Sequence, residues 1–335
     1  FLRASLEAFD PQGEVKLALL RIDDKLAGLV PLHCARAYYG RPIPHVASWL
    51  HDNAFCGVPL IARGFETMFW SMLLRWVDQN PGLAAFLHLQ GIPESCAPDA
   101  ALSVLTQEDD RANGVVEHEV RALLASELSP EEYFEQSLST KKRKELRRQA
   151  RRLAEQGELS VDRAETPEAI GVFSDEFLAL EAASWKGRAG SSLASDPACA
   201  QFFRESLLGA AQAGRVEGLS LRLDGEPIAM LATFLTPPGA FSFKTTFDER
   251  FARFSPGVLL QKENLDLLRR DGIDWCDSCA APDHPMIDHF WRGQRNVVSR
   301  NIAIGGSIRR LLGGRLIAHE SQRAASHKAM ESVSQ

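Results

Sequence analysis

The run from residue 240 to residue 277 constrains the fold of this chain more than any other part of the sequence. Its residue types predict, in order, a strand at 240–247, a polar loop at 248–254, a helix at 258–270 and a second strand at 273–277. Asp271 and Gly272 separate the helix from the second strand, as expected of a helix end. Strand, helix and strand within so short a segment indicate an α/β fold.

The start of this helix has the composition of an anion-binding site. Helix starts leave backbone N–H groups unpaired and carry partial positive charge, and glycine lets a ligand approach the backbone closely. We therefore expect a phosphorylated carrier to be held there. The residues expected to hold it are Lys244 on the strand, Arg253 in the loop, and Ser255, Gly257 and Val258 at the helix start. Ordinary helix capping by Ser255 and Pro256 is the alternative interpretation.

Composition places the chain among ordinary globular proteins. Its 335 residues favour two domains, and its 45% hydrophobic and 24% charged fractions are typical of such proteins. A net charge of −6 argues against specific DNA binding. The six cysteines are scattered, so we expect reduced thiols and a cytoplasmic location. Because the sequence begins with Phe1 rather than Met, a preceding segment that carries a targeting signal is one of the alternatives that the sequence allows.

The chain is expected to divide into two similar modules, residues 1–125 and 126–320, followed by a polar tail at 321–335. Each module is predicted to contain an antiparallel hairpin, a helix and a further strand. The expected hairpin turns are Asp23-Asp24-Lys25 in the first module and Asp224-Gly225 in the second.

One segment is strongly basic although the chain is acidic overall. Between Lys141 and Arg152 the sequence has eight Lys or Arg residues and a single Glu. On a helix, the basic positions from 144 to 152 share one broad face, and Leu146 and Leu153 can pack inward. The segment predicts contact with a phosphate-bearing ligand or peripheral binding at the anionic surface of the inner membrane. A solvated helix face is the alternative.

Several short motifs occur in an order that resembles a known family. In the second half they are Ser139-Thr140-Lys141-Lys142-Arg143-Lys144-Glu145-Leu146, Ala183-Ser184-Trp185-Lys186-Gly187, Gly225-Glu226-Pro227-Ile228-Ala229, and Phe251-Ala252 before Ser255-Pro256-Gly257. In the first half they are Leu26-Ala27-Gly28-Leu29-Val30-Pro31-Leu32 and Cys56-Gly57-Val58-Pro59-Leu60. The order resembles the CelD-like (BioF2-like) acetyltransferases of the GNAT superfamily, relatives of FemAB peptidyltransferases. The resemblance covers residues 139–280 best.

The resemblance implies an α/β (α+β) fold of two tandem GNAT-like modules, each a mixed, mostly antiparallel sheet flanked by helices. It also implies transfer of an acyl group from a thioester, usually acyl-CoA, to an amine. The first module would lie on the acceptor side, and the second would hold the donor at the helix start described above. Residues 254–257 contain fewer glycines than the usual GNAT phosphate signature. An acyl carrier protein or, as in FemAB relatives, an aminoacyl-tRNA therefore stays open as donor.

Acyl transfer to an amine needs a base that removes a proton from the ammonium group. His284 follows the second strand and precedes Pro285, and it is the expected base, with Asp277 as its orienting carboxylate. His51, in a polar loop of the first module, is the alternative base. A turn cap without a catalytic role is the other interpretation of His284, and His289 is expected to be a packing residue.

Four further residues are candidates for substrate binding. Asn53 and Phe55 lie in the loop of His51, and Trp185 and Lys186 lie at the end of a predicted helix. Core packing of the Trp and a helix-dipole role for the Lys are the alternatives. No metal site is expected, because Cys276, Cys279 and the histidines after them are too closely spaced for a zinc finger.

The acceptor class stays open at this stage. An amino sugar of an envelope polysaccharide, a small amine and a long-chain sphingoid base, as in bacterial ceramide synthases, all fit the resemblance. A non-catalytic GNAT-like scaffold subunit of polysaccharide biosynthesis is the alternative from a different functional class.

Overall fold

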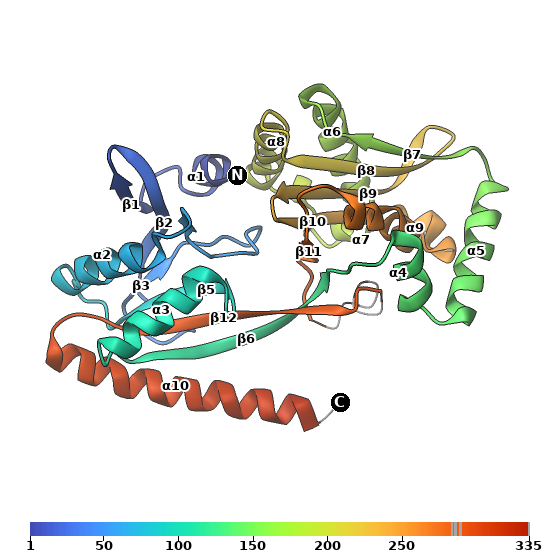
Figure 1. The fold of residues 1–335 in the computed structure, drawn as a ribbon. Helices are drawn as coiled ribbons and strands as arrows, with labels where there is room; N and C mark the ends of the chain where they lie inside the picture. The colour runs from blue at the N-terminus through green and yellow to red at the C-terminus, as the bar shows by residue number, and fades with distance from the viewer. Residues whose placement is uncertain (283, 285–286, 288–289, 334–335) are drawn as a thin grey trace. The chain divides into compact units, whose positions relative to one another are not determined.

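The structure is a computed structural model that describes residues 1–282, 284, 287 and 290–333. It divides the chain into two compact units (Figure 1). Unit 1 comprises Phe1–Pro11 and Arg121–Gln294, and unit 2 comprises Gln12–Val120 and Arg295–Gln335. This division differs from the expected cut near residue 125, because the first helix belongs to unit 1 and the last helix to unit 2.

Unit 1 is built on a mixed, mostly antiparallel sheet with the strand order β6-β11-β10-β9-β8-β7. The strands are β6 (Asn113–Leu124), whose end lies in this unit, β7 (Leu159–Ala164), β8 (Val216–Leu223), β9 (Glu226–Thr236), β10 (Gly239–Phe247) and β11 (Trp275–Asp277). Neighbours are antiparallel except β10 and β11, which run parallel. The predicted turn between β8 and β9 is confirmed, with positive φ angles of 51° at Asp224 and 84° at Gly225.

Helices cover both faces of this sheet. They are α1 (Leu2–Phe9), α4 (Pro130–Ser137), α5 (Thr140–Ala154), α6 (Pro167–Ala183), α7 (Trp185–Arg188), α8 (Pro197–Ala211) and α9 (Pro256–Glu263), with 3₁₀ turns η1 (Leu193–Ser195), η2 (Glu249–Phe254) and η3 (Asn264–Arg269). Ser129, Ser139, Thr166 and Asp196 each cap a helix by accepting a hydrogen bond from a backbone N–H two or three residues further on. These caps explain where four of the helices begin.

The two faces of the unit 1 sheet have different cores. On one face the packing is aromatic: the ring of Phe1 lies 5.2 Å from Phe202 of α8 and 5.6 Å from Phe234 of β9. On the other face the packing is aliphatic, and Leu260 of α9 packs with Leu219 of β8 and other residues of β8 and β9. The aromatic contacts of Phe1 explain why α1 belongs to unit 1.

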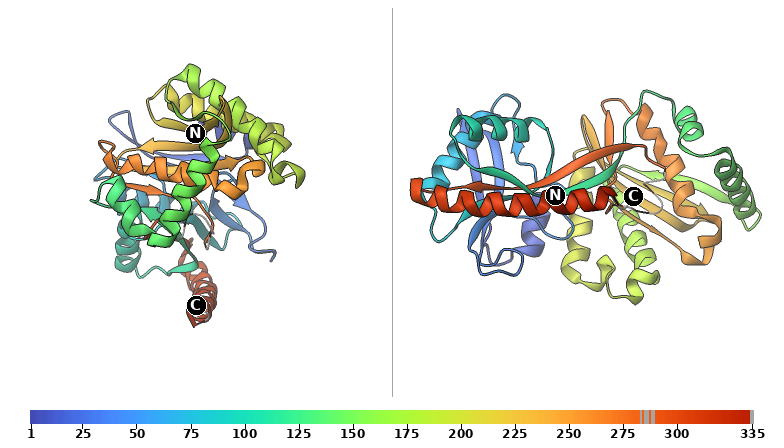
Figure 2. Two further views of the ribbon diagram at one scale, coloured as in Figure 1. Left: turned by 90° about the vertical axis from the view of Figure 1, so that its right-hand side faces the viewer. Right: turned by 90° about the horizontal axis from the view of Figure 1, so that it is seen from below.

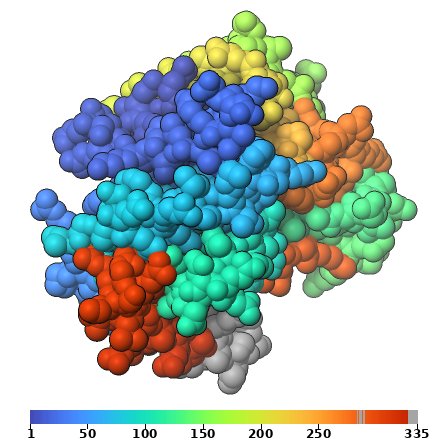
Figure 3. Space-filling model, turned by 60° about the vertical axis from the view of Figure 1, so that its left-hand side comes forward, coloured from blue at the N-terminus to red at the C-terminus, as the bar shows by residue number. Residues whose placement is uncertain are grey.

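In unit 2 the strands follow in the order β1-β2-β3-β5-β12-β6, where residues 113–120 of β6 belong to this unit, and β4 pairs with β2 beside this row. The other strands are β1 (Lys16–Ile22), β2 (Lys25–Ala35), β3 (His45–Ser48), β4 (Leu60–Ile61), β5 (Phe86–Pro93) and β12 (Gly293–Ala303). Among the pairs that β1 to β5 and β12 make with one another, only β3 and β5 are parallel. The predicted turn at Asp23 and Asp24 is confirmed, with φ angles of 47° and 59°. The hairpin of β1 and β2, in dark blue, lies on the face that Figure 3 shows.

The helices of unit 2 are α2 (Glu66–Gln79), α3 (Ala97–Glu108) and α10 (Ser307–Val333). Trp70 and Leu74 of α2 are buried in a core that also contains Val30 and Leu87 of the sheet. The described part of the polar tail expected from residue 321 forms the end of one long helix, α10 (Figure 2). Its Ile317 is buried in a separate cluster with Tyr38, Phe86 and Ala303 of the same unit.

The predicted α/β class of two modules with mostly antiparallel sheets is confirmed. Five helices or strands were not predicted from the sequence, namely α3, α7, α10, β4 and β7. The single helix predicted at 258–270 is wrong in its second half, where the chain forms the 3₁₀ turn η3 after α9. Asn264 at this junction is buried and donates a hydrogen bond through its side chain to Gln261, so local polar contacts replace the regular helix.

Candidate active site

The parallel strands β10 and β11 part after a short pairing. Gly239, Ala240 and Phe241 pair with Trp275, Cys276 and Asp277, and β10 then continues to Phe247. In the described residues, no strand pairs with this edge of β10 beyond Phe241. A register shift between Ser242 and Lys244 bulges the strand at the same point. The open edge of β10 can therefore accept an extended ligand through its backbone groups. We call this place the β10–β11 split.

The helix start predicted to hold a phosphate directly follows β10 and η2. Ser255 is the N-cap residue of α9 and has a left-handed backbone, with φ of 54° and ψ of 51°. Its side chain makes no capping hydrogen bond with the described part of the chain, so the ordinary capping interpretation is wrong for Ser255. Gly257 is buried, Val258 is half-buried and the side chain of Arg253 is exposed. This arrangement leaves α9 with a partial positive charge beside an exposed guanidinium group.

A buried ion pair lies on the opposite side of β10, where α6 and α7 meet. The Glu181 carboxylate is only 2% exposed, and its Oε1 accepts a hydrogen bond of 2.9 Å from Lys186 Nζ. Its Oε2 accepts a bond of 2.7 Å from the backbone N–H of Leu193. Lys186 Nζ also lies 3.4 Å from the carbonyl oxygen of Thr245 on β10. The pair therefore joins α6, α7, η1 and β10.

Lys244 of β10 belongs to the same electrostatic neighbourhood. Burial lowers the pKa of the Lys244 ammonium group, and the positive charge of Lys186 lowers it further. Glu181, Cys279 and Cys199 act on this pKa in the opposite direction. A lysine with a lowered pKa releases its proton more readily than an ordinary lysine.

The motif around Lys186 has a structural explanation. α6 ends at Ala183, and the Ser184 hydroxyl accepts a 3.2 Å hydrogen bond from the backbone N–H of Lys186 to begin α7. A Cβ on Gly187 would collide with the carbonyl oxygen of Ala182, so only glycine fits there. The side chain of Trp185 is 53% exposed, so the core-packing alternative for it is wrong. The motif thus holds Lys186 against Glu181 and presents Trp185 to solvent.

Asp277 and His284, the proposed orienting acid and base, lie after β11. The Asp277 carboxylate is buried, and its Oδ1 accepts a 2.8 Å hydrogen bond from the backbone N–H of Cys279, whose φ is 53°. The aspartate therefore stabilises a tight turn at the strand end. His284 is half-buried, and its carbonyl oxygen accepts a 3.2 Å bond from the N–H of Ile287. His289 and the helix expected at Pro285 lie outside the described residues.

His51, Asn53 and Phe55 belong to unit 2 and are described within that unit. The backbone N–H of Asn53 donates to Nδ1 of His51 over 3.3 Å, and the His51 ring lies 5.6 Å from Trp49. Asn53 is buried and Phe55 is half-buried. The imidazole thus closes a short turn through its Nδ1 atom. Roles in catalysis for His51 and in binding for Asn53 and Phe55 stay predictions.

Helix α5 contains the basic segment and has the two faces that the sequence predicts. Leu146 and Leu153 are buried. Lys142 pairs with Glu145 over 3.3 Å, and Arg143 donates to the carbonyl oxygen of Leu138 over 2.9 Å. The exposed cations for which no partner is found in the described residues are Lys141, Lys144, Arg148, Arg151 and Arg152. One side of α5 therefore offers several unpaired positive charges to solvent.

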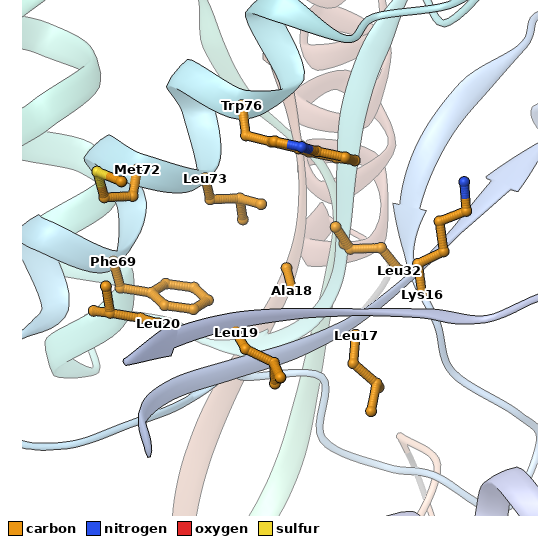
Figure 4. Close-up of a pocket in the computed structure, with 10 residues that line it drawn as sticks. All are labelled: Lys16, Leu17, Ala18, Leu19, Leu20, Leu32, Phe69, Met72, Leu73 and Trp76. Atoms are coloured by element: carbon orange, nitrogen blue, oxygen red, sulfur yellow. The ribbon is translucent and has the colours of Figure 1, made fainter. Parts of the chain in front are cut away.

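Unit 2 contains a cavity of about 430 Å³ between its first hairpin and α2 (Figure 4). Nine of its lining residues are apolar, and Lys16 is the exception; the nine are Leu17, Ala18, Leu19, Leu20, Leu32, Phe69, Met72, Leu73 and Trp76. Met72 is 51% exposed and Trp76 is 47% exposed, so the apolar lining reaches the surface. A cavity with this lining suits a hydrocarbon group.

Two searches of the described residues gave negative results. No three or more His, Cys, Asp or Glu side chains gather there in a way that could hold a metal ion. Among the helices in this part of the chain, none combines the length and the apolar character needed to span a bilayer.

Sequence reasoning missed Glu181, the residue around which the α6–α7 region is organised. It lies in an apolar stretch of α6, and its burial depends on Lys186 and Leu193, which come later in the chain. In the sequence, Glu181 is a single carboxylate flanked by alanine and leucine, and this pattern was the available sign that it is buried. Buried carboxylates are rare unless they are paired, so this signal could have been followed.

Comparisons with known proteins agree with this geometry. The family model described as "Acetyltransferase (GNAT) domain" matches residues 140–284, which include α9, β10 and β11. No curated protein sequence matches the chain. The fold is similar to that of FemX, with a TM-score of 0.55 and 9% identity over 90% of each chain.

Two lipid-related proteins share the fold as well. One is the C-terminal domain (DUF2156) of a putative lysylphosphatidylglycerol synthetase from Agrobacterium fabrum, with a TM-score of 0.55, 14% identity, and coverage of 92% of this chain and 89% of that chain. The other is L-PGS from Bacillus licheniformis, with a TM-score of 0.52, 14% identity, and coverage of 94% and 96%. Identities this low show likeness of fold only. Residues 140–284 are thus similar to a GNAT acetyltransferase domain, which supports an acyltransferase, and the fold of the chain is similar to that of FemX.

Proposed function

We propose that this protein transfers an acyl group from acyl-CoA to an amine of an envelope component. The observation that carries the proposal is the β10–β11 split, which opens one edge of β10 directly before the start of α9. An extended thioester arm fits along such an edge through backbone hydrogen bonds, and a pyrophosphate fits at a helix start. The proposed contacts for the phosphates are Arg253, Ser255, Gly257 and Val258.

The reaction joins the acceptor nitrogen to the carbonyl carbon of the thioester. A base first removes a proton from the ammonium group, the amine then attacks, and the C–S bond breaks to release coenzyme A as a thiol. We assign the base to His284, positioned by Asp277, with His51 as the alternative. Lys244 lies near the proposed course of the donor, where its positive charge suits a developing oxyanion.

The acceptor side is assigned to unit 2, with Asn53 and Phe55 as proposed contacts, while Trp185 and Lys186 are the proposed contacts in unit 1. The apolar cavity of unit 2 favours an acceptor with a hydrocarbon chain, such as a long-chain base, over an amino sugar. The unpaired cations of α5 support action at the cytoplasmic face of an anionic membrane, where each Lys or Arg near the surface contributes about 1 kcal/mol.

A polyanionic donor is the second candidate. The same five α5 cations, Lys141, Lys144, Arg148, Arg151 and Arg152, suit the backbone of an aminoacyl-tRNA as well as a lipid surface. Under this reading the protein is an aminoacyl transferase, and coenzyme A does not bind. An acyl carrier protein presents the same thioester arm and is a third source of the acyl group.

A thermal-shift series tests the proposal. Coenzyme A and acyl-CoAs of rising chain length are added to the full chain, and binding at 100 times Kd should stabilise it by about 2.7 kcal/mol. A preference for long acyl chains supports a lipid product, and a preference for acetyl supports a sugar product. The acyl-CoA proposal is refuted if no CoA compound raises the melting temperature while tRNA or a holo acyl carrier protein does.

A further inference from the structure

The apolar cavity of unit 2 has a closed inner end and an open outer end. At the inner end, Leu20 of β1 and Phe69 of α2 are buried. A Cβ on Gly28 would lie 3.3 Å from Leu20 and collide with the ring of Phe69, so the strand and the helix meet closely there. At the outer end, Trp76 of α2 is half-exposed and Lys16 of β1 is exposed.

The two elements set the distance between these ends. Trp76 follows Phe69 by seven residues, which is about 10 Å along a helix. Lys16 precedes Leu20 by four residues, which is about 13 Å along a strand. The cavity is therefore elongated, and its volume of about 430 Å³ is that of an ordinary ligand site. An elongated apolar space suits one extended hydrocarbon chain.

Lys16 is on the side of β1 that faces α2. Side chains alternate along a strand, so Lys16 shares its side with Ala18 and Leu20, and the register shift of the hairpin comes only after Leu20. Ala18 and Leu20 pack in the same core as residues of α2. Figure 4 shows the side chains of Lys16 and Ala18 on the α2 side of the strand and those of Leu17 and Leu19 on the other side. Lys16 is thus the polar end of an otherwise apolar lining.

The charge around the outer end is positive. For the ammonium group of Lys16, no hydrogen bond or ion pair is found in the described part of the chain. Arg75, next to Trp76 on α2, is exposed and also lacks a partner among the described residues. The ten residues that line the cavity include no carboxylate, and Glu14, the nearest one in the sequence, precedes the strand. An ammonium group at this end would meet like charge, whereas a carboxylate or phosphate would meet opposite charge.

We propose that this cavity binds the hydrocarbon chain of a single-chain anionic amphiphile, and that Lys16 binds its carboxylate or phosphate group. The chain lies between β1 and α2 with its end beside Phe69, and the head group lies at the outer end. A lysine suits this position because its stem covers apolar surface while its ammonium group stays in water. Met72, which is flexible and half-exposed, can adapt to the chain near the surface.

This binding site goes beyond the proposed transfer reaction, since occupation of the cavity requires no acyl transfer. It also restricts the acceptor suggested above. An acceptor whose chain occupies the cavity needs an anionic group beside that chain in addition to its amine. A long-chain amine without such a group would place its ammonium group beside Lys16.

Isothermal titration calorimetry with probes of equal chain length tests the proposal. The probes are dodecanoate, dodecyl phosphate and dodecylammonium, each added to the full chain below the concentration at which it forms micelles. Both anions should bind. Dodecylammonium should bind at least fivefold more weakly, since fivefold corresponds to an exposed ion pair of about 1 kcal/mol. Octanoate should bind more weakly than dodecanoate, by about fourfold for each methylene group that the cavity no longer buries.

Two substitutions separate the head group from the chain. Lys16→Met keeps an apolar stem and removes the charge, so both anions should lose about fivefold in affinity while dodecylammonium should lose none. Lys25→Met is the matched control, because Lys25 is exposed on the same hairpin and does not line the cavity. Ala18→Leu fills part of the cavity and should weaken all three probes alike. The melting temperature of each variant shows whether it is folded.

The two anions also identify the source of the head group. Tighter binding of dodecyl phosphate indicates a lipid phosphate monoester, and equal or tighter binding of dodecanoate indicates a free fatty acid; either result supports the site. Three results would overturn the proposal: dodecylammonium binds as tightly as the anions, no probe binds, or either folded cavity variant binds the anions as the wild type does. None of these results bears on the proposed acyl transfer, because no readout uses coenzyme A or turnover.

Discussion

Replacing Lys186 with Met tests whether this residue serves the fold or the substrate. Its ammonium group lies 2.9 Å from the Glu181 carboxylate, which is 2% exposed. In Lys186→Met the carboxylate would keep the N–H of Leu193 as a partner but would lose its counter-ion. Breaking one side of a buried ion pair costs about 3–5 kcal/mol. Because Lys186 itself is 29% exposed, we expect the low end of that range, about 3 kcal/mol.

The assay combines urea unfolding with local hydrogen exchange. The Leu193 amide, 2.7 Å from Glu181 Oε2, should lose protection in Lys186→Met. The double variant Lys186→Met with Glu181→Gln should be less destabilised than the sum of the single variants, since no buried charge remains. Lys142→Met, which breaks an exposed pair of 3.3 Å, is the control and should change the unfolding free energy by less than about 1 kcal/mol. An unchanged unfolding free energy in Lys186→Met, together with a raised KM for the acceptor, would refute this reasoning and make Lys186 a substrate contact.

Four further outcomes are expected. Gly257→Val should weaken donor binding without unfolding the protein, as titration with coenzyme A would show; unchanged affinity in the folded variant removes the start of α9 from the site. Neutralising the basic face of α5 (Arg147, Arg148, Arg151 and Arg152 to Gln) should reduce binding to anionic vesicles strongly at low salt and less at high salt, whereas a solvated face predicts no change. His284→Ala should lower turnover by about 10²–10⁴ with donor affinity nearly intact, and near-normal turnover would move the assignment to His51. Burial lowers the pKa of His88 to about 4, so the unfolded state binds its proton more readily between that value and 6.5. The stability of unit 2 should therefore fall by about 3 kcal/mol from pH 7 to pH 4, and His88→Gln should flatten this dependence unless the neighbouring His33 and His45 cause it.

The sequence predicted the elements that have strong local signals. The hairpin turns at Asp23-Asp24 and Asp224-Gly225 are set by the residue types of the turn itself, and the start of α9 is set by Pro256 and Gly257. β7 was missed because it is short and three consecutive residues in it, from Val161 to Arg163, are exposed, so a buried apolar face is not apparent in its sequence. Its place at the sheet edge depends on pairing with β8, which comes more than 50 residues later.

The candidate site was predictable only where it is local. Lys244 and the α9 start could be named because strand, loop and helix adjoin in the sequence. The Glu181–Lys186 pair could not, because its importance comes from burial, which a long-range packing arrangement creates.

The interleaving of the two units has a consequence for synthesis of the chain. Residues 12–120 of unit 2 emerge early, but their sheet lacks β12, which pairs with β5 and ends at Ala303. All residues of unit 1 have been made once Gln294 is synthesised. Unit 1 is therefore complete before unit 2, although most of unit 2 is synthesised earlier. Ile302 of β12 packs in the core that contains residues of β5 and α2. This core therefore stays partly exposed to solvent while almost the whole of unit 1 is translated. A fragment limited to 140–284 would lack both Phe1 and the end of β6, and a continuous version of unit 1 requires residue 11 to be joined directly to residue 121.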